Sequence, residues 1–453
     1  MEEYRILTPQ GMLGYGVPEE DFWRGMGAKP DVIIMDGGST DPGPYLLGLG
    51  KTIVSRQGYL RDLRIVLEGV GRHRVPLIVT SAGGAGTNAQ VETMIELIRE
   101  VAAELGHSFK LAAIYSDIEK AVVLDSLAGG RIIPCASAPP LNREDVETST
   151  NIVAQMGAEP IATVLTEHPD VDIILTGRSY DPAPFAAFCA TKGIDPGLYW
   201  HLGKIAECGA LCAEPKGKAI MVTVRKDSFD LEPLAPNARC TPISVAAHTL
   251  YEKSRPDLLA GPGGVLDLTN SRYEQLTDRI VRVRGSEFIP SDTYQVKVEG
   301  AAPCGFRSTF IGGIRDPILI GQIDRFLASV REELAVLFSE VRDGDAQIHF
   351  HVYGRDGVMG PSEPLRDHVP HEIGLLGEVT AATQEMATAI CTMARIWTLH
   401  LSYPGQMATA GNFAIPLNPP DNEIGQVCRF SIYHLMDVDD PTSLFPVKTM
   451  DIV

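Results

Sequence analysis

The sequence predicts an α/β fold, with a doubly wound, mainly parallel N-terminal sheet and a second domain of the α+β type. Short apolar runs alternate with helical patterns through the first half of the chain, which is typical of a parallel sheet with connecting helices. The second half loses this alternation. With 453 residues, the chain has material for two domains. We place them at residues 1–215 and 216–453, because the segment EPKG at Glu214–Gly217 interrupts the pattern.

The predicted elements of the first half follow from apolar spacing. Short, continuous apolar runs are typical of strands buried on both faces, and apolar residues at helical spacing predict amphipathic helices between them. The predicted strands are Val32–Met35, Pro76–Thr80, Leu111–Tyr115, Ile132–Pro134 and Val171–Thr176. The predicted helices are Gln90–Leu105, Asp117–Gly129 and Ser149–Glu167.

The second half mixes helical and alternating patterns without a regular order, which favours an α+β arrangement. Helices are predicted at Thr241–Tyr251, Asp316–Val341 and Gly377–Trp397. Strands are predicted at Ala219–Arg225, within Arg279–Val298, at Gln347–Tyr353 and in the tail from Asn418.

Composition narrows the class of protein. The net charge of −19 argues against a nucleic-acid or anionic-membrane partner, but it is compatible with an anionic small molecule, because the field of a site is local. The eight cysteines form no CxxC pair, and Cys208 and Cys212 lack a second pair to complete a metal site. MEEYRILTPQ has no signal-peptide pattern, and no apolar run could span a bilayer. We therefore expect a reduced, cytoplasmic protein.

The first candidate site is the segment DVIIMDGGSTDPGP, at Asp31–Pro44. A buried strand ends here in Asp36, and ligands of α/β sheets bind at the carboxyl ends of strands. Asp36 is a candidate catalytic residue. Glycines permit a close approach of the backbone to a ligand. The candidate substrate-binding residues are Gly37, Gly38, Ser39, Thr40 and Asp41. The alternative is a turn that needs Gly and uses Asp as a helix cap.

The second candidate site is SAGGAGTN, at Ser81–Asn88, between a predicted strand and a predicted helix. A glycine-rich turn at a helix N-terminus can bind a carboxylate or phosphate through free N–H groups and the helix dipole. The spacing matches neither a Rossmann nor a Walker A motif. The candidate binding residues are Ser81, Gly83, Gly84, Gly86 and Thr87. Tight packing of the turn is the alternative.

The third candidate site is GRSYDP, at Gly177–Pro182, directly after the strand that ends at Thr176. The Arg178 guanidinium could bind a carboxylate through its planar fork. Asp181 is a candidate acid or base, or could hold Arg178 in place. Ser179 and Tyr180 complete the candidate binding residues of this loop.

Further charged residues have two interpretations each. YWHLGKIAECG brings His201, Lys204 and Glu207 within two helical turns, either as a functional group with Glu207 catalytic or as a capping cluster on a helix face. Arg56 and Arg61 are either further carboxylate partners or solvated helix charges, and we favour solvation for Arg61.

His349 and His351 flank Phe350 in a predicted strand, so both imidazoles lie on one face. A metal could use this geometry, but it would also need Asp345 or a more distant carboxylate. A polar strand face is the more common case, so we expect no metal site and no cofactor.

Five segments between about Asp31 and Gly300 are distinctive when taken together. They are MDGGSTDPGPYLLG, TSAGGAGTN, TGRSYDPAPFAA, HLGKIAECGA and GPGGVLDLTNSRYEQL. In this order they resemble the acyclic terpene utilisation AtuA-like family. The resemblance implies a role in the catabolism of branched or carboxylated small acids and their thioesters, with lyase or hydratase steps.

These observations together predict an enzyme that adds or removes water next to the carboxylate of a small acid or its thioester. An Asp or Glu would move the proton, and Arg178 and the glycine-rich loop would hold carboxylates. The alternatives are a metal-dependent amide or lactone hydrolase and a non-catalytic binding or assembly subunit. We expect a homo-oligomer, with or without a small companion subunit, and neither a nucleic-acid nor a membrane partner.

Overall fold

The computed structural model describes residues 2–39, 42–251, 255–409 and 412–453. The fold is mixed α/β, and the chain divides into two compact units. The first unit consists of residues 1–302 and 430–453, and the second of residues 303–429. The boundary predicted at Glu214–Gly217 lies within the first unit, because the strand that follows it pairs with the N-terminal strand of the chain.

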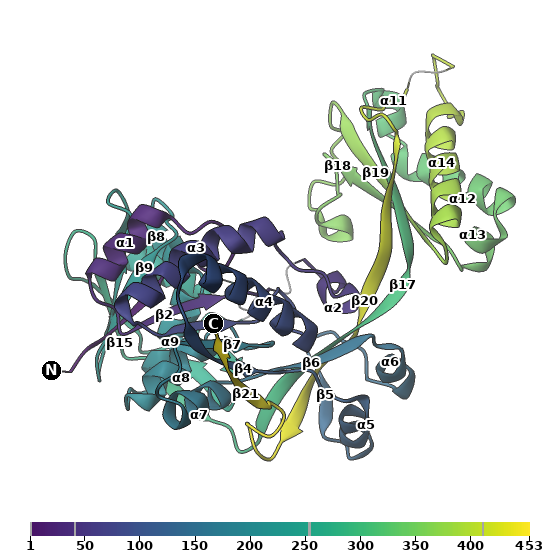
Figure 1. Cartoon of the computed structure of the whole chain (residues 1–453). Coiled ribbons are helices and arrows are strands. Elements are labelled where there is room, and N and C mark those ends of the chain that lie inside the picture. The colour runs from purple at the N-terminus through teal and green to yellow at the C-terminus, as the bar shows by residue number, and fades with distance from the viewer. Residues whose placement is uncertain (1, 40–41, 252–254, 410–411) are drawn as a thin grey trace. The chain divides into compact units, whose positions relative to one another are not determined.

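Counted over the described residues, the first unit is built on a ten-stranded sheet in the order β14-β15-β10-β9-β1-β2-β3-β7-β4-β21. Figure 1 shows α3 and α4 on one side of its central strands and α7 and α8 on the other. Five central strands, β1 (Tyr4–Thr8), β2 (Val32–Asp36), β3 (Leu77–Thr80), β7 (Ile173–Thr176) and β4 (Phe109–Ile114), are parallel. The outer strands are antiparallel: β9 (Ile220–Val224), β10 (Phe229–Pro233), β15 (Val281–Arg284), β14 (Arg272–Gln275) and β21 (Val447–Ile452).

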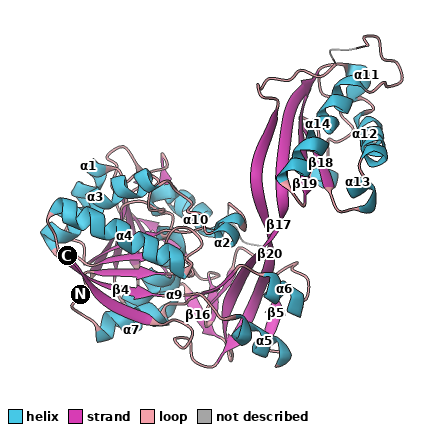
Figure 2. Ribbon diagram, turned by 45° about the vertical axis from the view of Figure 1, so that its right-hand side comes forward, coloured by secondary structure: helices cyan, strands magenta, loops and turns pink. Residues whose placement is uncertain are grey.

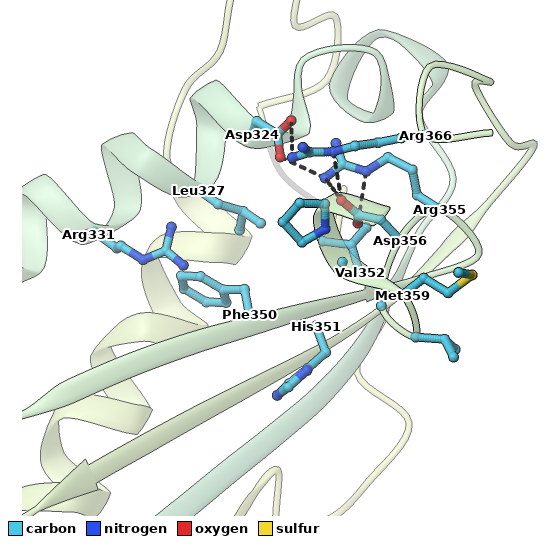
Figure 3. Close-up of a pocket in the computed structure, with 14 residues that line it drawn as sticks. Asp324, Leu327, Arg331, Phe350, His351, Val352, Arg355, Asp356, Met359 and Arg366 are labelled. Atoms are coloured by element: carbon cyan, nitrogen blue, oxygen red, sulfur yellow. Dashed lines mark hydrogen bonds and ion pairs between the residues drawn. The ribbon is translucent and has the colours of Figure 1, made fainter. Parts of the chain in front are cut away.

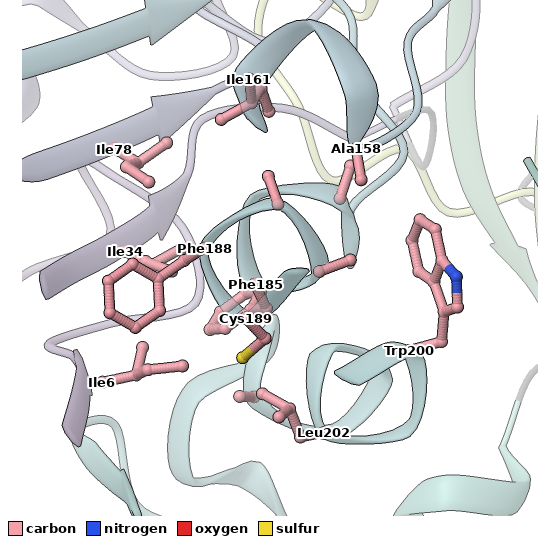
Figure 4. Packing of buried hydrophobic residues seen from close by; sticks show 14 of the residues in the cluster. Ile6, Ile34, Ile78, Ala158, Ile161, Phe185, Phe188, Cys189, Trp200 and Leu202 are labelled. Atoms are coloured by element: carbon pink, nitrogen blue, oxygen red, sulfur yellow. The ribbon is translucent and has the colours of Figure 1, made fainter. Parts of the chain in front are cut away.

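Successive residues of each central strand point to opposite faces of the sheet. Because these residues are apolar on both faces, helices cover both. On one face, Ile34 and Ile78 pack with α7 (Glu159–Glu167), α8 (Ala183–Thr191) and α9 (Pro196–Ala206). Figure 4 shows this core, with Phe185 and Phe188 near the strands. On the other face, Ile33 packs with α1 (Glu19–Gly27), α3 (Arg56–His73) and α4 (Asn88–Leu105).

A second group of strands in the first unit supplies residues to the site described below. The first part of β17 (Tyr294–Ile314) pairs antiparallel with β6 (Asn151–Gln155), and the last part of β20 (Asp421–Val438) pairs with β5 (Ile132–Pro134). The long strands β17 and β20 carry the chain between the two units (Figure 2).

Shorter elements complete the first unit. Its other helices are α2 (Tyr45–Leu49), α5 (Lys120–Ala128), α6 (Arg143–Thr148), α10 (Pro242–Leu250) and the 3-10 helix η1 (Gly209–Cys212). Its other strands are β8 (Ala213–Glu214), β11 (Arg239–Cys240), β12 (Leu258–Gly261), β13 (Gly264–Asp267) and β16 (Glu287–Pro290).

In the second unit, an antiparallel sheet packs against helices. β19 (Ile373–Ala381) pairs with β17 on one side and with β18 (Gln347–Tyr353) on the other. One hydrophobic core joins this sheet to α11 (Pro317–Ile320), α12 (Ile323–Leu337) and α14 (Gln384–His400). The short helices α13 (Ser339–Asp343) and η2 (Gly360–Ser362) complete the unit.

Three predicted helices differ from the structure. Ser149–Glu167 contains the strand β6 before α7, and Gly377–Trp397 contains the end of β19 before α14. Asp316–Val341 is divided into α11, α12 and α13. In the first two cases, pairing with β17 overrides the local helical pattern.

Among the described helices, none combines the length and the apolar character needed to cross a bilayer.

Candidate active site

A cavity of about 530 Å³ opens in the first unit, beside the loops that follow β1, β2 and β7. These loops leave the carboxyl ends of parallel strands, where ligands of α/β sheets bind. The cavity brings together Asp36, Arg178, Asp181 and Glu207, with Gly38 and Ser39 from the same predicted set. The other lining residues are Gln10, Gly11, Met12, Tyr15, Cys208, Leu211, Gly217, Lys218 and Tyr251.

Asp36 is the last residue of β2, and its side chain is almost fully buried at the cavity wall. Its Oδ1 accepts hydrogen bonds from the N–H groups of Gly37 (2.8 Å) and Gly38 (3.3 Å) and from the Thr80 hydroxyl (3.0 Å). Burial raises the pKa of Asp36 to about 8 against these donors, and the nearby Asp181 carboxyl adds to the shift. At neutral pH, the Asp36 carboxyl therefore retains its proton.

Asp181 and Arg178 lie in the loop between β7 and α8. The Arg178 side chain is only 3 % exposed, and its Nη1 lies 3.6 Å from Asp181 Oδ1. The Asp181 side chain keeps 38 % of its surface exposed where it lines the cavity. Partial removal of the Asp181 carboxyl from water raises its pKa, and the Arg178 cation opposes this shift. Asp181 is thus the most accessible of the three carboxyl groups.

Glu299 holds Arg178 from another direction, and the sequence did not single it out. Arg178 Nε donates to Glu299 Oε2 at 2.9 Å, and Lys297 Nζ lies 2.7 Å from Glu299 Oε1. Burial tends to raise the pKa of Glu299, but the two cations outweigh burial and hold the pKa at about 2. Glu299 is therefore an ionised carboxylate within the protein, with a side chain only 3 % exposed.

Strand pairing positions Glu299 beside Arg178. Glu299 of β17 is paired with Val153 of β6. Met156, which follows β6, donates its N–H to the carbonyl of Arg178 at 3.0 Å and accepts from the N–H of Tyr180 at 2.9 Å. The backbone of β6 thus connects β17 directly to the loop that carries Arg178.

Glu207 follows α9 and forms the third carboxyl group of the cavity. Its Oε1 accepts a hydrogen bond from Lys204 Nζ at 2.8 Å. Its Oε2 is buried and has no hydrogen-bond partner within the described part of the chain. Burial raises the pKa of Glu207 to about 8, although Lys204 opposes the shift. A protonated Oε2 fits these surroundings at neutral pH.

The charges of the connected ion pairs beside the cavity do not balance if every group is ionised. Lys218, an exposed cation that also lines the cavity, lies outside these pairs and donates to the carbonyls of Tyr15 and Gly16. Three cations, Arg178, Lys204 and Lys297, face four carboxyl groups. If Asp36 and Glu207 hold protons, and Asp181 and Glu299 are ionised, the group carries one net positive charge. In that protonation state, the cavity would contain two proton donors, one proton acceptor and a net charge that favours an anionic ligand.

The glycine-rich loop packs against Gly38 and against the backbone of Arg178, two residues that line the cavity. The N–H groups of Gly84 and Gly86 donate to the carbonyls of Ser81 and Ala82, and that of Thr87 donates to the Gln90 side chain. Thr87 also caps α4 in a capping box. These bonds occupy three of the N–H groups that the predicted anion cradle would use, which supports the alternative of tight packing for this part of the loop.

The variant Gly86→Ala tests whether this loop is tightly packed against the Arg178 loop. Gly86 has φ +69°, and a Cβ there would stand 2.2 Å from the backbone nitrogen of Arg178. We expect a loss of about 1–3 kcal/mol in the free energy of unfolding, measured in urea, because the Arg178 loop must shift. Gly106→Ala is the matched control, because its φ is also +69° but nothing lies within 4 Å. Equal losses in the two variants would contradict this expectation.

The loop that follows β1 supplies Gln10, Gly11, Met12 and Tyr15 to the cavity, and Asp62 of α3 fixes it. The Asp62 side chain is fully buried and accepts from the N–H groups of Gly14 (2.8 Å), Gly16 (2.9 Å) and Val17 (3.1 Å). The sequence did not indicate this loop, although it also follows an apolar run.

We expect Asp62→Asn to destabilise the protein by about 1–3 kcal/mol, because the amide NH₂ cannot accept a hydrogen bond from the loop. Thermal unfolding measures this loss, with exposed Asp278→Asn as the control. An unchanged unfolding temperature in Asp62→Asn would show that the loop does not depend on this carboxylate.

Other predicted residues lie away from the cavity lining. Ser179 bonds the Thr176 hydroxyl at 2.7 Å, and Tyr180 packs on Trp200. His201 is a buried core residue whose ring bonds Ser286 and Thr249. In α3, Arg56 pairs with Glu100, and Arg61 pairs with Asp62 at 2.9 Å. Thr40 and Asp41 lie outside the described residues.

His349 and His351 lie on β18 in the second unit. His351 Nε2 is 3.8 Å from Glu378 Oε2 on the paired strand β19. Within the described residues, no group of three or more His, Cys, Asp or Glu side chains could hold a metal ion.

One protein-family model matches the chain, that of the acyclic terpene utilisation family protein AtuA, over residues 28–214 and 232–416. The match includes the loops of Asp36, Arg178, Asp181 and Glu207. No curated protein and no solved structure matches the chain at a significant level. The name of the family implicates its members in the catabolism of acyclic terpenes. Because the match covers most of the chain and confirms the predicted resemblance, this protein belongs to the acyclic terpene utilisation family AtuA.

Proposed function

We propose that this protein is a lyase that adds or removes water next to the carboxylate of a small acid or its thioester. The proposal rests on one observation: Asp36, Asp181 and Glu207 line the same cavity as Arg178. Dehydration of a hydroxy acid needs a base that removes a proton and an acid that protonates the departing hydroxyl. A cavity that holds both protonated and ionised carboxyl groups can supply both.

The surroundings of the three carboxyl groups favour different roles. Asp181 is the most accessible and lies beside the Arg178 cation, so we assign it as the base. Asp36 and Glu207, with pKa values of about 8, are the candidate acids. Asp181 would take the proton from the carbon next to the carboxylate, and the C–H electrons would form the double bond. The C–O bond would break, and the acid would protonate the hydroxyl, which leaves as water.

A carboxylated substrate fits the charge of the site. With Asp36 and Glu207 protonated and Asp181 and Glu299 ionised, the connected ion pairs would carry one net positive charge. The exposed Lys218 adds another positive charge at the cavity wall, so the site would attract an anionic substrate. Negative charge that develops during proton removal would also be stabilised by Arg178, which Glu299 and Asp181 hold in a fixed position.

Proton transfer to and from carbon can be measured before the natural substrate is known. The protein is incubated in D₂O with a panel of small 2- and 3-hydroxy acids and unsaturated acids, both free and as thioesters. Proton NMR then detects deuterium at the carbon next to the carboxylate and any conversion between hydroxy and unsaturated acids. We expect Asp181→Asn to lower the rate by about 10²–10⁴-fold.

Asp170→Asn is the matched control for this experiment, because Asp170 is an exposed residue whose side chain pairs with Lys110. It should exchange deuterium at the wild-type rate. A wild-type rate in Asp181→Asn would refute the role of Asp181 as the base. A panel without any exchange or conversion would contradict the proposed reaction.

The turnover should also depend on pH in a defined direction. Asp36 and Glu207 lose their protons as the pH rises through about 8. The dehydration rate should therefore fall above about pH 8, because the acid that protonates the departing hydroxyl is lost. A rate that keeps rising through pH 9 would contradict a carboxylic acid as the proton donor.

A further inference from the structure

A second cavity, of about 470 Å³, lies wholly within the second unit and has an arginine-rich wall. It is bounded by α12, by β18 and by the loop that follows β18 (Figure 3). Arg331, Arg355 and Arg366 line it together with Asp324 and Asp356. Residues 303–429 contain nine arginines and no lysine. Because the guanidinium group is a planar fork that matches a carboxylate or a phosphate, this wall is suited to an anion.

Two of the arginines are fixed by the two aspartates. Arg355 binds Asp356 through Nε (3.1 Å) and Nη2 (2.9 Å), and its Nη2 also reaches Asp324 at 2.7 Å. Arg366 lies 2.9 Å from Asp356 and 3.4 Å from Asp324. The Arg355 and Asp356 side chains are each only 10 % exposed, whereas Arg366 and Asp324 lie nearer the surface, at 42 % and 62 % exposed. Within the described residues, the Nη1 groups of both arginines stay outside these bonds, which leaves them able to donate to a ligand.

Arg331 is a third cation on the opposite side of the cavity. Its guanidinium lies 4.8 Å from the centre of the Phe350 ring, and Figure 3 shows it apart from the network of Arg355 and Arg366. Its surroundings lower the pKa of Arg331, because burial outweighs the attraction of Asp324. Arg331 therefore carries a charge that no described carboxylate pairs with at ion-pair distance, and a bound anion would compensate it.

We propose that this cavity binds a small monocarboxylate with an apolar body. The three guanidinium groups and two carboxylates give the wall one net positive charge, which a single carboxylate would neutralise. A phosphate dianion would leave an excess negative charge in the same space. The aromatic face of Phe350 and the exposed side chains of Val358 and Met359, which also line the cavity, would contact the apolar body. The proposal does not depend on the proposed reaction, because the residues involved belong to the other unit.

Isothermal titration of the full-length protein with hexanoate, and separately with inorganic phosphate at equal ionic strength, tests this site. We expect saturable hexanoate binding, and weaker or undetectable phosphate binding. Arg331→Gln should weaken hexanoate binding by about 10-fold or more, because it removes the uncompensated cation. Arg325→Gln is the matched control, because Arg325 is an exposed arginine on the same helix outside the cavity, and it should bind as the wild type does.

A second variant tests the apolar part of the ligand. Met359→Ser should weaken binding of hexanoate more than binding of acetate, because only hexanoate reaches the apolar rim. The proposal is overturned if wild-type protein shows no saturable hexanoate binding, or if Arg331→Gln binds hexanoate as tightly as Arg325→Gln does. Tighter binding of phosphate than of hexanoate would overturn the assignment of a carboxylate ligand.

Discussion

Replacing Glu299 by Gln is expected to destabilise the protein by about 3–5 kcal/mol, because Lys297 loses the carboxylate it contacts and Arg178 keeps only the more distant Asp181. Arg178 is 3 % exposed and Lys297 19 % exposed, and both contact the Glu299 carboxylate directly. Gln offers one acceptor oxygen and no charge, so neither cation is fully compensated. Urea denaturation at pH 7 measures this loss.

The control for Glu299→Gln is Glu274→Gln. Glu274 pairs with Arg284 at 3.0 Å, but this pair is exposed, so its loss should cost less than about 1 kcal/mol. Folding lowers the pKa of Glu299 from its ordinary value of 4.5 to about 2. Ionised Glu299 therefore stabilises the folded protein fully above pH 4.5, and this stabilisation is lost as the pH falls toward 2. The difference between wild type and Glu299→Gln should therefore shrink in acid. A pH-independent difference would refute an ionised Glu299.

Replacing Asp36 by Asn should lower turnover by about 10²–10⁴-fold, because the amide cannot exchange a proton with the substrate. The fold should survive, since Asn Oδ1 can accept the same three hydrogen bonds from Gly37, Gly38 and Thr80. Turnover and unfolding measured on the same preparation separate these two effects. Full activity in a folded Asp36→Asn variant would remove Asp36 from the mechanism.

The same variant should gain stability relative to the wild type as the pH rises. Folded Asp36 keeps a proton up to a pKa of about 8, whereas the unfolded chain loses it near its ordinary value of 3.8. Between these values the native state binds more protons, so wild-type stability falls as the pH rises, by up to about 1.4 kcal/mol per pH unit for this group. Asn lacks this dependence. A constant stability difference between pH 4 and 8 would show that Asp36 is ionised in the folded state.

The parallel part of the fold could be predicted from the sequence because its strands are short, apolar and bounded by turns. Val32–Met35 and Pro76–Thr80 correspond closely to β2 and β3. The sequence predicts a helix at Asn151–Gln155, because its apolar residues also fit a helical pattern with the segment that follows. Its strand conformation depends on pairing with β17, whose residues are about 150 positions away, and no local pattern encodes that partner.

The candidate site could be predicted in part for the same reason. Asp36, Arg178 and Asp181 each come at or after the end of a recognisable strand. Because ligands of α/β sheets bind at the carboxyl ends of strands, these residues are expected at one site. Glu299 lies within a strand, 121 residues from Arg178, and only the pairing of β17 with β6 places it there. For the glycines of Ser81–Asn88, the sequence leaves ligand binding and tight packing open, and the close approach of the Arg178 backbone to Gly86 favours packing there.

The proposed reaction depends on Asp36 and Glu207 retaining their protons at neutral pH, and carbon-13 NMR of labelled Asp and Glu carboxyl groups measures this protonation. Spectra recorded between pH 4 and 9 would follow each group, with Asp36→Asn and Glu207→Gln assigning the signals. We predict two carboxyl signals that titrate near pH 8, one of which disappears in each variant. If both signals instead titrate below about pH 5, as carboxyl groups in water do, the cavity holds no protonated pair and the proposed acid–base chemistry is refuted.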